Sequence, residues 1–205
     1  MKPSARDWLL LCALHGVASM LLWWASKDWM EALTWQAMDW PSQPWTLWTT
    51  VWVHMNTPHL IGNQMALGAM TAMAWIVHPP RLCTLAWVLA WPLTTLTLLW
   101  WPQIGYSVGL SGVLHAGALV LAVHLLFKRM VVPKARRWGG LLALAILAKL
   151  MLEQGWAYPV VWSPGNEMSV VQAAHLAGSV WGLVLGLATV WLGGGWRVGL
   201  RGVQA

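Results

Sequence analysis

Ser111 has the surroundings in this chain that most favour nucleophilic chemistry. It lies in the run Gly109-Leu110-Ser111-Gly112, at the start of an apolar stretch. A serine hydroxyl is a poor nucleophile unless a general base takes its proton. His175, at the start of a later apolar stretch, is the candidate base. The glycines let the backbone approach a substrate closely, and a helix start aims unpaired amide hydrogens at developing negative charge.

Three further polar residues accompany this pair. His59 and Asn63 are four residues apart, so on a helix they share one face and can donate hydrogen bonds to one oxyanion. His115 follows Ser111 by one helical turn and can pack against or hydrogen-bond His175, holding its ring. We expect no carboxylate to be placed to orient His175. The residues therefore predict a Ser-His dyad for acyl transfer, not a triad.

The composition indicates an integral membrane protein. Of 205 residues, 59% are hydrophobic and only 9% are charged, against roughly 25% charged residues in soluble domains. The 20 tryptophans are interpreted as anchors at headgroup depth. The net charge of +6 is not gathered on one face beside base-stacking aromatics, so no nucleic-acid partner is expected.

The cysteine pattern gives no sign of a disulfide framework or a thiolate metal site. Only Cys12 and Cys83 occur, both in or beside apolar stretches, and we interpret them as core residues. No cofactor or metal ion is expected.

The hydropathy predicts an all-α membrane protein with six transmembrane helices in a single domain, residues 1–205. A span needs about 20 apolar residues, and six stretches qualify: 8–25, 58–77, 82–101, 109–127, 138–156 and 169–192. The connection 26–57 is rich in tryptophan and is broken by two prolines. We expect it to lie in the outer interface.

The charge distribution predicts that both termini are cytoplasmic, because short cytoplasmic loops collect lysine and arginine. By alternation of the spans one side holds Lys2, Arg6, Arg81, Lys128, Arg129, Lys134, Arg136, Arg137, Arg197 and Arg201. The opposite side holds Asp28, Glu31, Asp39, Glu153 and Glu167, with Lys27 as its only basic residue. Lys149 can snorkel outward or pair with Glu153.

Three predicted spans carry polar residues at one depth near their outer ends: the second, the fourth and the sixth. An ionisable residue inside a membrane helix is a functional-site hypothesis by default, because its burial is costly. The coincidence of depth therefore supports the Ser111 and His175 pair. We interpret the other histidines His15, His78 and His124 as interface or packing residues.

The last span contains small residues at intervals of four: Ala174, Gly178, Gly182 and Gly186. On a helix this spacing forms one smooth stripe, which lets the backbone of a neighbouring helix come close.

These motifs resemble the rhomboid intramembrane serine proteases from about Trp45 to Gly186. Three segments match the family signatures in order: His54-Met55-Asn56-Thr57-Pro58-His59-Leu60-Ile61-Gly62-Asn63, Gly109-Leu110-Ser111-Gly112, and Ala174-His175-Leu176-Ala177-Gly178 followed by Gly182. Rhomboids usually carry Trp-Arg nine residues before the first of these histidines, where this chain has Trp45 and Thr46.

The resemblance implies a six-helix bundle with a water-filled cavity open to the outside, cleaving membrane-anchored protein substrates within the bilayer. Ser111 would be the nucleophile and His175 the base. His59, Asn63 and the backbone amide of Ser111 would line the oxyanion hole, and His54 would be structural. The implied location is the bacterial inner membrane, with the active site open to the periplasmic side.

Within the family, the compact build and the histidine at position 115 look like the rhombosortase branch, since many rhomboids have tyrosine there. That branch is thought to cut before the tail helix of surface proteins with a Gly-Gly-containing C-terminal anchor. The alternative within the class is a rhomboid that cleaves other single-span proteins.

Two alternatives of other classes remain. In one, His59, His115 and His175 line a membrane protein that binds haem or a metal ion, or passes protons. In the other, the chain is a catalytically inactive scaffold of rhomboid shape. The serine between glycines argues against the first, and the presence of both Ser111 and His175 argues against the second.

Overall fold

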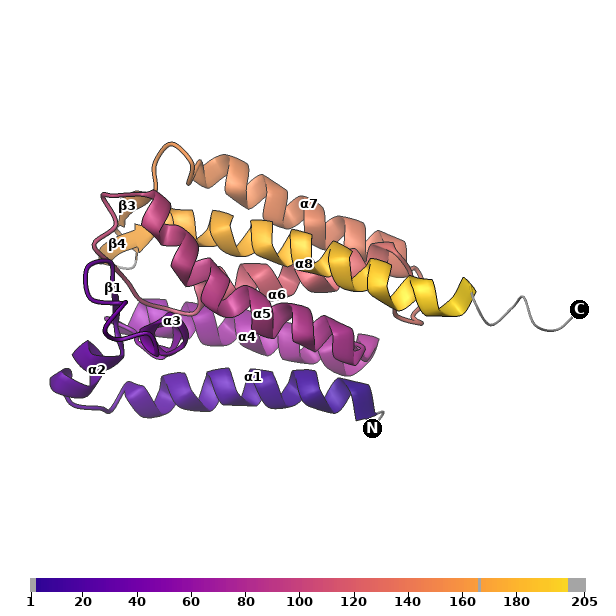
Figure 1. The fold of residues 1–205 in the computed structure, drawn as a ribbon, viewed down its shortest axis with the longest axis horizontal. Coiled ribbons are helices and arrows are strands. Elements are labelled where there is room, and N and C mark those ends of the chain that lie inside the picture. The colour runs from indigo at the N-terminus through magenta and orange to yellow at the C-terminus, as the bar shows by residue number, and fades with distance from the viewer. Residues whose placement is uncertain (1–2, 166, 199–205) are drawn as a thin grey trace, which may run out of the picture.

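The computed structural model describes residues 3–165 and 167–198. Long helices run side by side, and short strands and helices gather at one end of the bundle (Figure 1). The elements, in order, are α1 (Pro3–Leu22), α2 (Lys27–Leu33), β1 (Trp35–Gln36), α3 (Thr46–Thr49), η1 (Thr50–Trp52), α4 (Thr57–Val77), α5 (Arg81–Thr97), η2 (Leu98–Trp100), β2 (Tyr106–Ser107), α6 (Ser111–Leu126), α7 (Ala135–Glu153), β3 (Val160–Ser163), β4 (Met168–Val171) and α8 (Gln172–Val198).

The described part of the chain contains four helices long and apolar enough to cross a membrane: 5–22, 57–77, 81–100 and 172–193. α6 is apolar but has only 16 residues, and α7 carries Arg136, Arg137, Lys149 and Glu153. The predicted helical membrane fold is confirmed at this level. The count of six spans stays a prediction.

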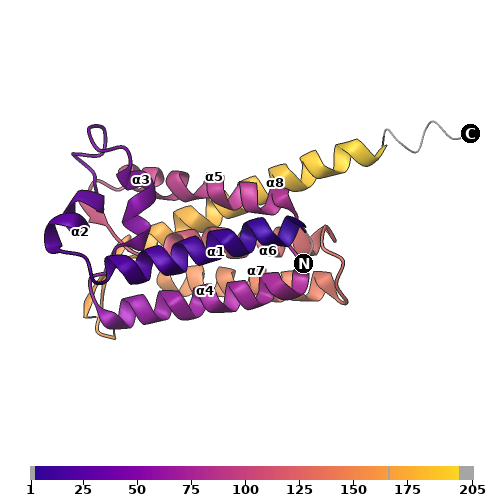
Figure 2. The same cartoon turned by 90° about the horizontal axis from the view of Figure 1, so that it is seen from below.

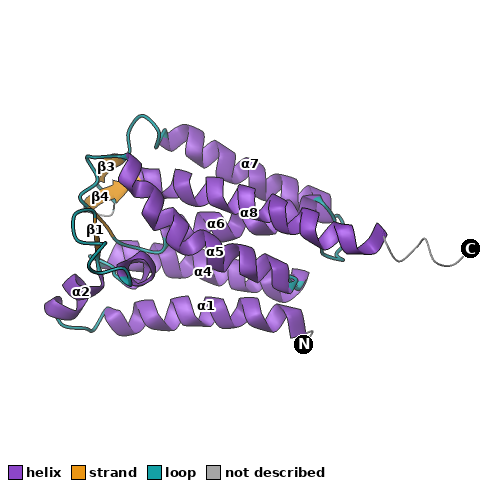
Figure 3. Ribbon diagram, in the orientation of Figure 1, coloured by secondary structure: helices purple, strands orange, loops and turns teal. Residues whose placement is uncertain are grey.

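The structure adds elements that the hydropathy did not predict. The described residues contain eight α-helices, where six were predicted. The two additional ones, α2 and α3, are short and lie within the first connection. Two antiparallel pairs of strands, β1 with β2 and β3 with β4, lie at the same end of the bundle (Figure 3). The prediction that residues 169–171 begin the sixth helix is wrong. These residues belong to β4, because Val170 and Val171 pair with Val161 and Val160 in a hairpin, which suits β-branched residues.

α6 is the central helix, since nearly all its side chains are buried. It packs most extensively against α8, and also against α5 and α7. The predicted small-residue stripe makes the α8 contact: a Cβ on Gly178 would overlap the carbonyl of Gly112, and one on Gly182 would overlap the carbonyl of Ala116. The two backbones therefore touch at the level of the serine motif.

The interpretation of the tryptophans as interface anchors is wrong for several of them. Trp8 and Trp87 are fully buried and their rings stack with centroids 4.4 Å apart. Trp87 Nε1 donates to the Val113 carbonyl oxygen at 2.8 Å, so this ring also positions α6. Others, such as Trp24 and Trp100, are largely exposed, as an anchor would be.

The beginning of α1 and the end of α8 lie at the same end of the bundle, opposite the strands (Figures 1 and 2). An even number of crossings would give this arrangement. Arg81 pairs with Asp7 at that end, at 3.1 Å. The expected cytoplasmic charges Lys2 and Arg201 lie outside the described residues.

The contact between α6 and α8 predicts that Gly178→Ala lowers stability. The added methyl group would push the two backbones apart, and overpacking of this kind costs about 1–3 kcal/mol. Gly68→Ala on α4 is the matched control, because nothing lies within 4 Å of its Cβ position. Thermal unfolding in detergent would measure both. Equal midpoints for Gly178→Ala and the unmodified chain would contradict the close contact.

Candidate active site

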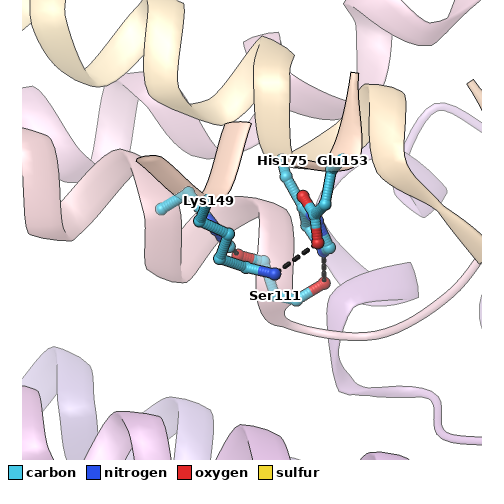
Figure 4. Close-up of polar contacts among 5 residues, drawn as sticks. Ser111, Lys149, Glu153 and His175 are labelled. Carbon is cyan, nitrogen blue, oxygen red and sulfur yellow. Dashed lines mark hydrogen bonds and ion pairs between the residues drawn. The ribbon is translucent and has the colours of Figure 1, made fainter. Parts of the chain in front are cut away.

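Ser111 and His175 meet at the end of the bundle that carries the strands. Ser111 is the first residue of α6, and His175 lies in the first turn of α8. The distance from Ser111 Oγ to His175 Nε2 is 2.8 Å, within hydrogen-bonding range (Figure 4). Two side chains 64 residues apart in sequence are thus in the geometry of a nucleophile and its base.

The turn before Ser111 depends on Gly109. Its φ of +96° is in the region that favours glycine, and a Cβ there would overlap the ring of His59. Leu110, the N-cap of α6, makes no side-chain capping bond. The first amides of α6 therefore receive no side-chain cap from that residue.

The first connection holds this turn in place. Gly109 N donates to the Thr50 carbonyl oxygen at 3.2 Å. The Thr50 hydroxyl donates to the Ser107 carbonyl oxygen and accepts a hydrogen bond from Trp35 N. The pairing of β1 with β2 adds backbone hydrogen bonds between the same segments. The predicted interfacial loop is thus an ordered support for the serine turn.

His59 and Asn63 project from the first two turns of α4. The Asn56 side chain caps this helix by accepting a hydrogen bond from His59 N at 3.0 Å. Asn63 Nδ2 donates to His54 Nε2 at 2.9 Å, and His54 Nδ1 donates to the Trp52 carbonyl oxygen at 3.0 Å. Burial lowers the pKa of His54, which favours the neutral ring that can accept from Asn63. The second amide hydrogen of Asn63 remains for another acceptor.

His115 takes the packing position that the sequence suggested. Its ring stacks on that of His175, with centroids 4.5 Å apart and planes 16° apart. Its Nδ1 donates to the Ser111 carbonyl oxygen at 2.7 Å. His115 thereby links the imidazole of His175 to the helix that carries Ser111.

The expectation that no carboxylate reaches His175 is wrong. Glu153 Oε2 lies 2.8 Å from His175 Nδ1, and Glu153 also pairs with Lys149 (Figure 4). The fifth span was predicted to extend to residue 156, but α7 ends at Glu153 because Gln154 adopts a left-handed conformation. Glu153 is therefore the last residue of α7, and its side chain is 16% exposed.

Two cavities adjoin the Ser111 hydroxyl. One, of about 490 Å³, lies among α4, α6, α7, α8 and the β3–β4 hairpin, and its lining includes His59, Asn63, Ser111, His115, Glu153 and His175. The other, of about 180 Å³, lies between β2 and β4 and is also lined by His59 and Ser111. All the predicted polar site residues thus border space next to the hydroxyl.

A family model of the Rhomboid domain matches residues 41–192, which include every one of these polar residues. The chain belongs to the rhomboid family. No match was found among curated proteins. Rhomboids are intramembrane serine proteases that act on membrane protein substrates within the bilayer. The family and the four apolar helices together make this rhomboid a multi-pass membrane protein.

The remaining histidines of this rhomboid lie away from the serine. His15 is fully buried and accepts a hydrogen bond from Trp52 Nε1 at 3.1 Å. His124 contacts the Thr189 hydroxyl at 3.1 Å, and His78 ends α4 in a left-handed conformation. These contacts agree with packing roles.

The haem or metal alternative has little geometric support. Within residues 3–165 and 167–198, no group of three His, Cys, Asp or Glu side chains is arranged to hold a metal ion. His115 and His175 instead stack face to face, and both nitrogens of His175 already have partners. Cys12 and Cys83 are free and buried.

Sequence reasoning on this rhomboid missed Glu153 and the hydrogen bond from Asn63 to His54. A signal for Glu153 was present: it is a lone carboxylate at the outer end of the fifth predicted span, four residues after Lys149. Alternation of the spans places that end on the same side as His175.

Proposed function

We propose that this rhomboid is an active intramembrane serine endopeptidase, with Ser111 as nucleophile and His175 as general base. The observation that carries the proposal is the 2.8 Å contact between Ser111 Oγ and His175 Nε2 in a chain of this family. The whole chain, residues 1–205, would form a single rhomboid-type membrane domain.

In the proposed reaction the Ser111 oxygen attacks the carbonyl carbon of the scissile peptide bond while His175 Nε2 takes the hydroxyl proton. A tetrahedral intermediate forms, and the same proton passes to the leaving amine as the peptide bond breaks. Water then hydrolyses the acyl-enzyme by the same route, with His175 again acting as base.

The oxyanion of the tetrahedral intermediate would accept hydrogen bonds from the Ser111 amide, the Asn63 side chain and His59. The uncapped start of α6 and the second amide hydrogen of Asn63 support this assignment. Loss of one such donor costs on the order of 10²-fold or more in rate. Gly109, Leu110 and Gly112 support the site by shaping the turn, and His115 supports it by packing on His175.

The proposed substrates are membrane-anchored proteins whose scissile segment reaches the cavity beside Ser111. We place both termini in the cytoplasm and the active site toward the periplasm, in a bacterial inner membrane. The excess of basic residues at the end of the bundle opposite the site supports this orientation.

We further propose that the enzyme is a rhombosortase, which processes surface proteins with a Gly-Gly-containing C-terminal anchor segment. His115 supports this narrower assignment, because its stacking on His175 makes the residue part of the site. A rhomboid that cleaves other single-span proteins is the alternative.

Ser111→Ala and His175→Ala should each abolish cleavage of a single-span reporter in proteoliposomes, because each removes one partner of the proton transfer. Ser179→Ala and His78→Asn are matched controls, since Ser179 lines neither of the two cavities beside Ser111 and His78 lies at the opposite end of α4. Gel analysis of the reporter measures the product. Cleavage retained in either active-site variant refutes the nucleophile and base assignment.

The rhombosortase assignment predicts a dependence on the substrate tail. A reporter with a Gly-Gly-containing C-terminal anchor should be processed, and replacing that anchor with an ordinary span should stop processing. The same purified enzyme and the same soluble reporter domain serve in both arms. Equal cleavage of the two reporters would favour the broader rhomboid activity.

A further inference from the structure

The Glu153 carboxylate uses one oxygen for each of two partners. Oε2 lies 2.8 Å from His175 Nδ1, and Oε1 pairs with Lys149 Nζ. The side chain of His175 is 5% exposed, that of Glu153 16% and that of Lys149 47%. The bond to the histidine is therefore the shielded one, and the lysine faces the open side of the cavity.

We propose that Glu153 is a positioning residue for His175, which makes the site a Ser111–His175–Glu153 triad and not a dyad. This inference rests on the proposed serine protease function. Glu153 acts through the imidazole and does not touch the reacting atoms.

The tautomer of His175 follows from its two contacts. Nε2 faces the Ser111 hydroxyl and must be unprotonated to take its proton, so Nδ1 carries the hydrogen of the neutral ring. That hydrogen points at Glu153 Oε2. The carboxylate selects the productive tautomer and fixes the direction of the ring.

The charge of the His175 ring changes as it takes and releases the Ser111 proton. When Nε2 takes the Ser111 proton, the imidazole becomes a cation, and Glu153 stabilises it while remaining ionised. When Nε2 gives the proton to the leaving amine, the ring returns to neutral. No proton needs to move to the carboxylate.

The backbone keeps the end of α7 against the start of α8. Gln154 ends α7 in a left-handed conformation, and at Gly155 a Cβ would lie 2.7 Å from the Gln172 carbonyl oxygen. Ala173 N donates to the Pro159 carbonyl oxygen at 3.1 Å. Glu153 and His175 are thereby held by elements whose main chains touch.

The other titratable groups around the pair come from three helices. Lys149 lies one turn before Glu153 on α7, His115 stacks on His175 from α6, and His59 of α4 lines the same cavity. Lys149 occupies the second carboxylate oxygen, which leaves Oε2 aimed at the base. Among the residues that the structure describes, Glu153 is the only carboxylate that lines this cavity.

The test is the rate of labelling of the purified full-length chain by a fluorophosphonate at neutral pH, compared among variants at position 153. We expect Glu153→Gln to slow labelling at neutral pH on the order of 10²-fold or more, because the ring loses its orientation and its counter-charge. Glu153→Asp keeps a carboxylate on α7 and should recover part of the rate, which Glu153→Gln cannot do.

Glu31→Gln is the matched control, because Glu31 forms an exposed pair with Lys27 at the same spacing of four residues. It should label like the unmodified chain. If Glu153→Gln labels at the same rate, or Glu153→Asp labels no faster than Glu153→Gln, Glu153 is only a structural ion-pair partner and the inference is overturned. Failure of the unmodified chain to label, or labelling of Ser111→Ala, would instead refute the proposed function.

Discussion

The structure depends on the close approach of α6 and α8. Gly178 lies against the backbone of Gly112, and Gly182 lies against that of Ala116. No side chain can stand between these two helices, so their first turns are held at contact distance. Because Ser111 opens α6 and His175 lies one turn into α8, this contact sets the separation of the hydroxyl and the imidazole.

The polar groups of the site are paired in two chains of hydrogen bonds and ion pairs. One chain runs from Ser111 through His175 and Glu153 to Lys149. The other runs from Asn63 through His54 to the Trp52 carbonyl oxygen. Burying an unpaired polar group is costly in protein and more so at membrane depth. These pairings therefore satisfy polar side chains that lie inside an otherwise apolar bundle.

The long helices and the meeting of Ser111 with His175 could be predicted from sequence. Hydropathy predicted the long helices, and the starts of the fourth and sixth predicted stretches were expected at one depth, where Ser111 and His175 lie 2.8 Å apart. The family match over residues 41–192 agrees with the motifs that suggested it. The stripe at Gly178 and Gly182 likewise made the contact that its spacing indicated.

Other features could not be predicted because they depend on where a helix stops or what surrounds a side chain. The fifth stretch was predicted to run to residue 156, three residues beyond the observed end of α7 at Glu153. Hydropathy does not show that Gln154 adopts the left-handed conformation that ends the helix. The apolar run before His175 is equally suited to helix and to strand, and its pairing with β3 decides in favour of strand. Composition cannot distinguish a lipid-facing tryptophan from Trp87, which is buried and bonded to α6.

The central claim is that the Ser111 hydroxyl is the activated nucleophile of the chain. The most direct measurement is mass spectrometry of the protein after reaction with a fluorophosphonate, locating the modified residue by fragmentation. Ser107 and Ser169 line a neighbouring cavity and serve as internal comparisons. The account predicts a single adduct on Ser111; an adduct on Ser107 or Ser169, with Ser111 unmodified, would contradict it.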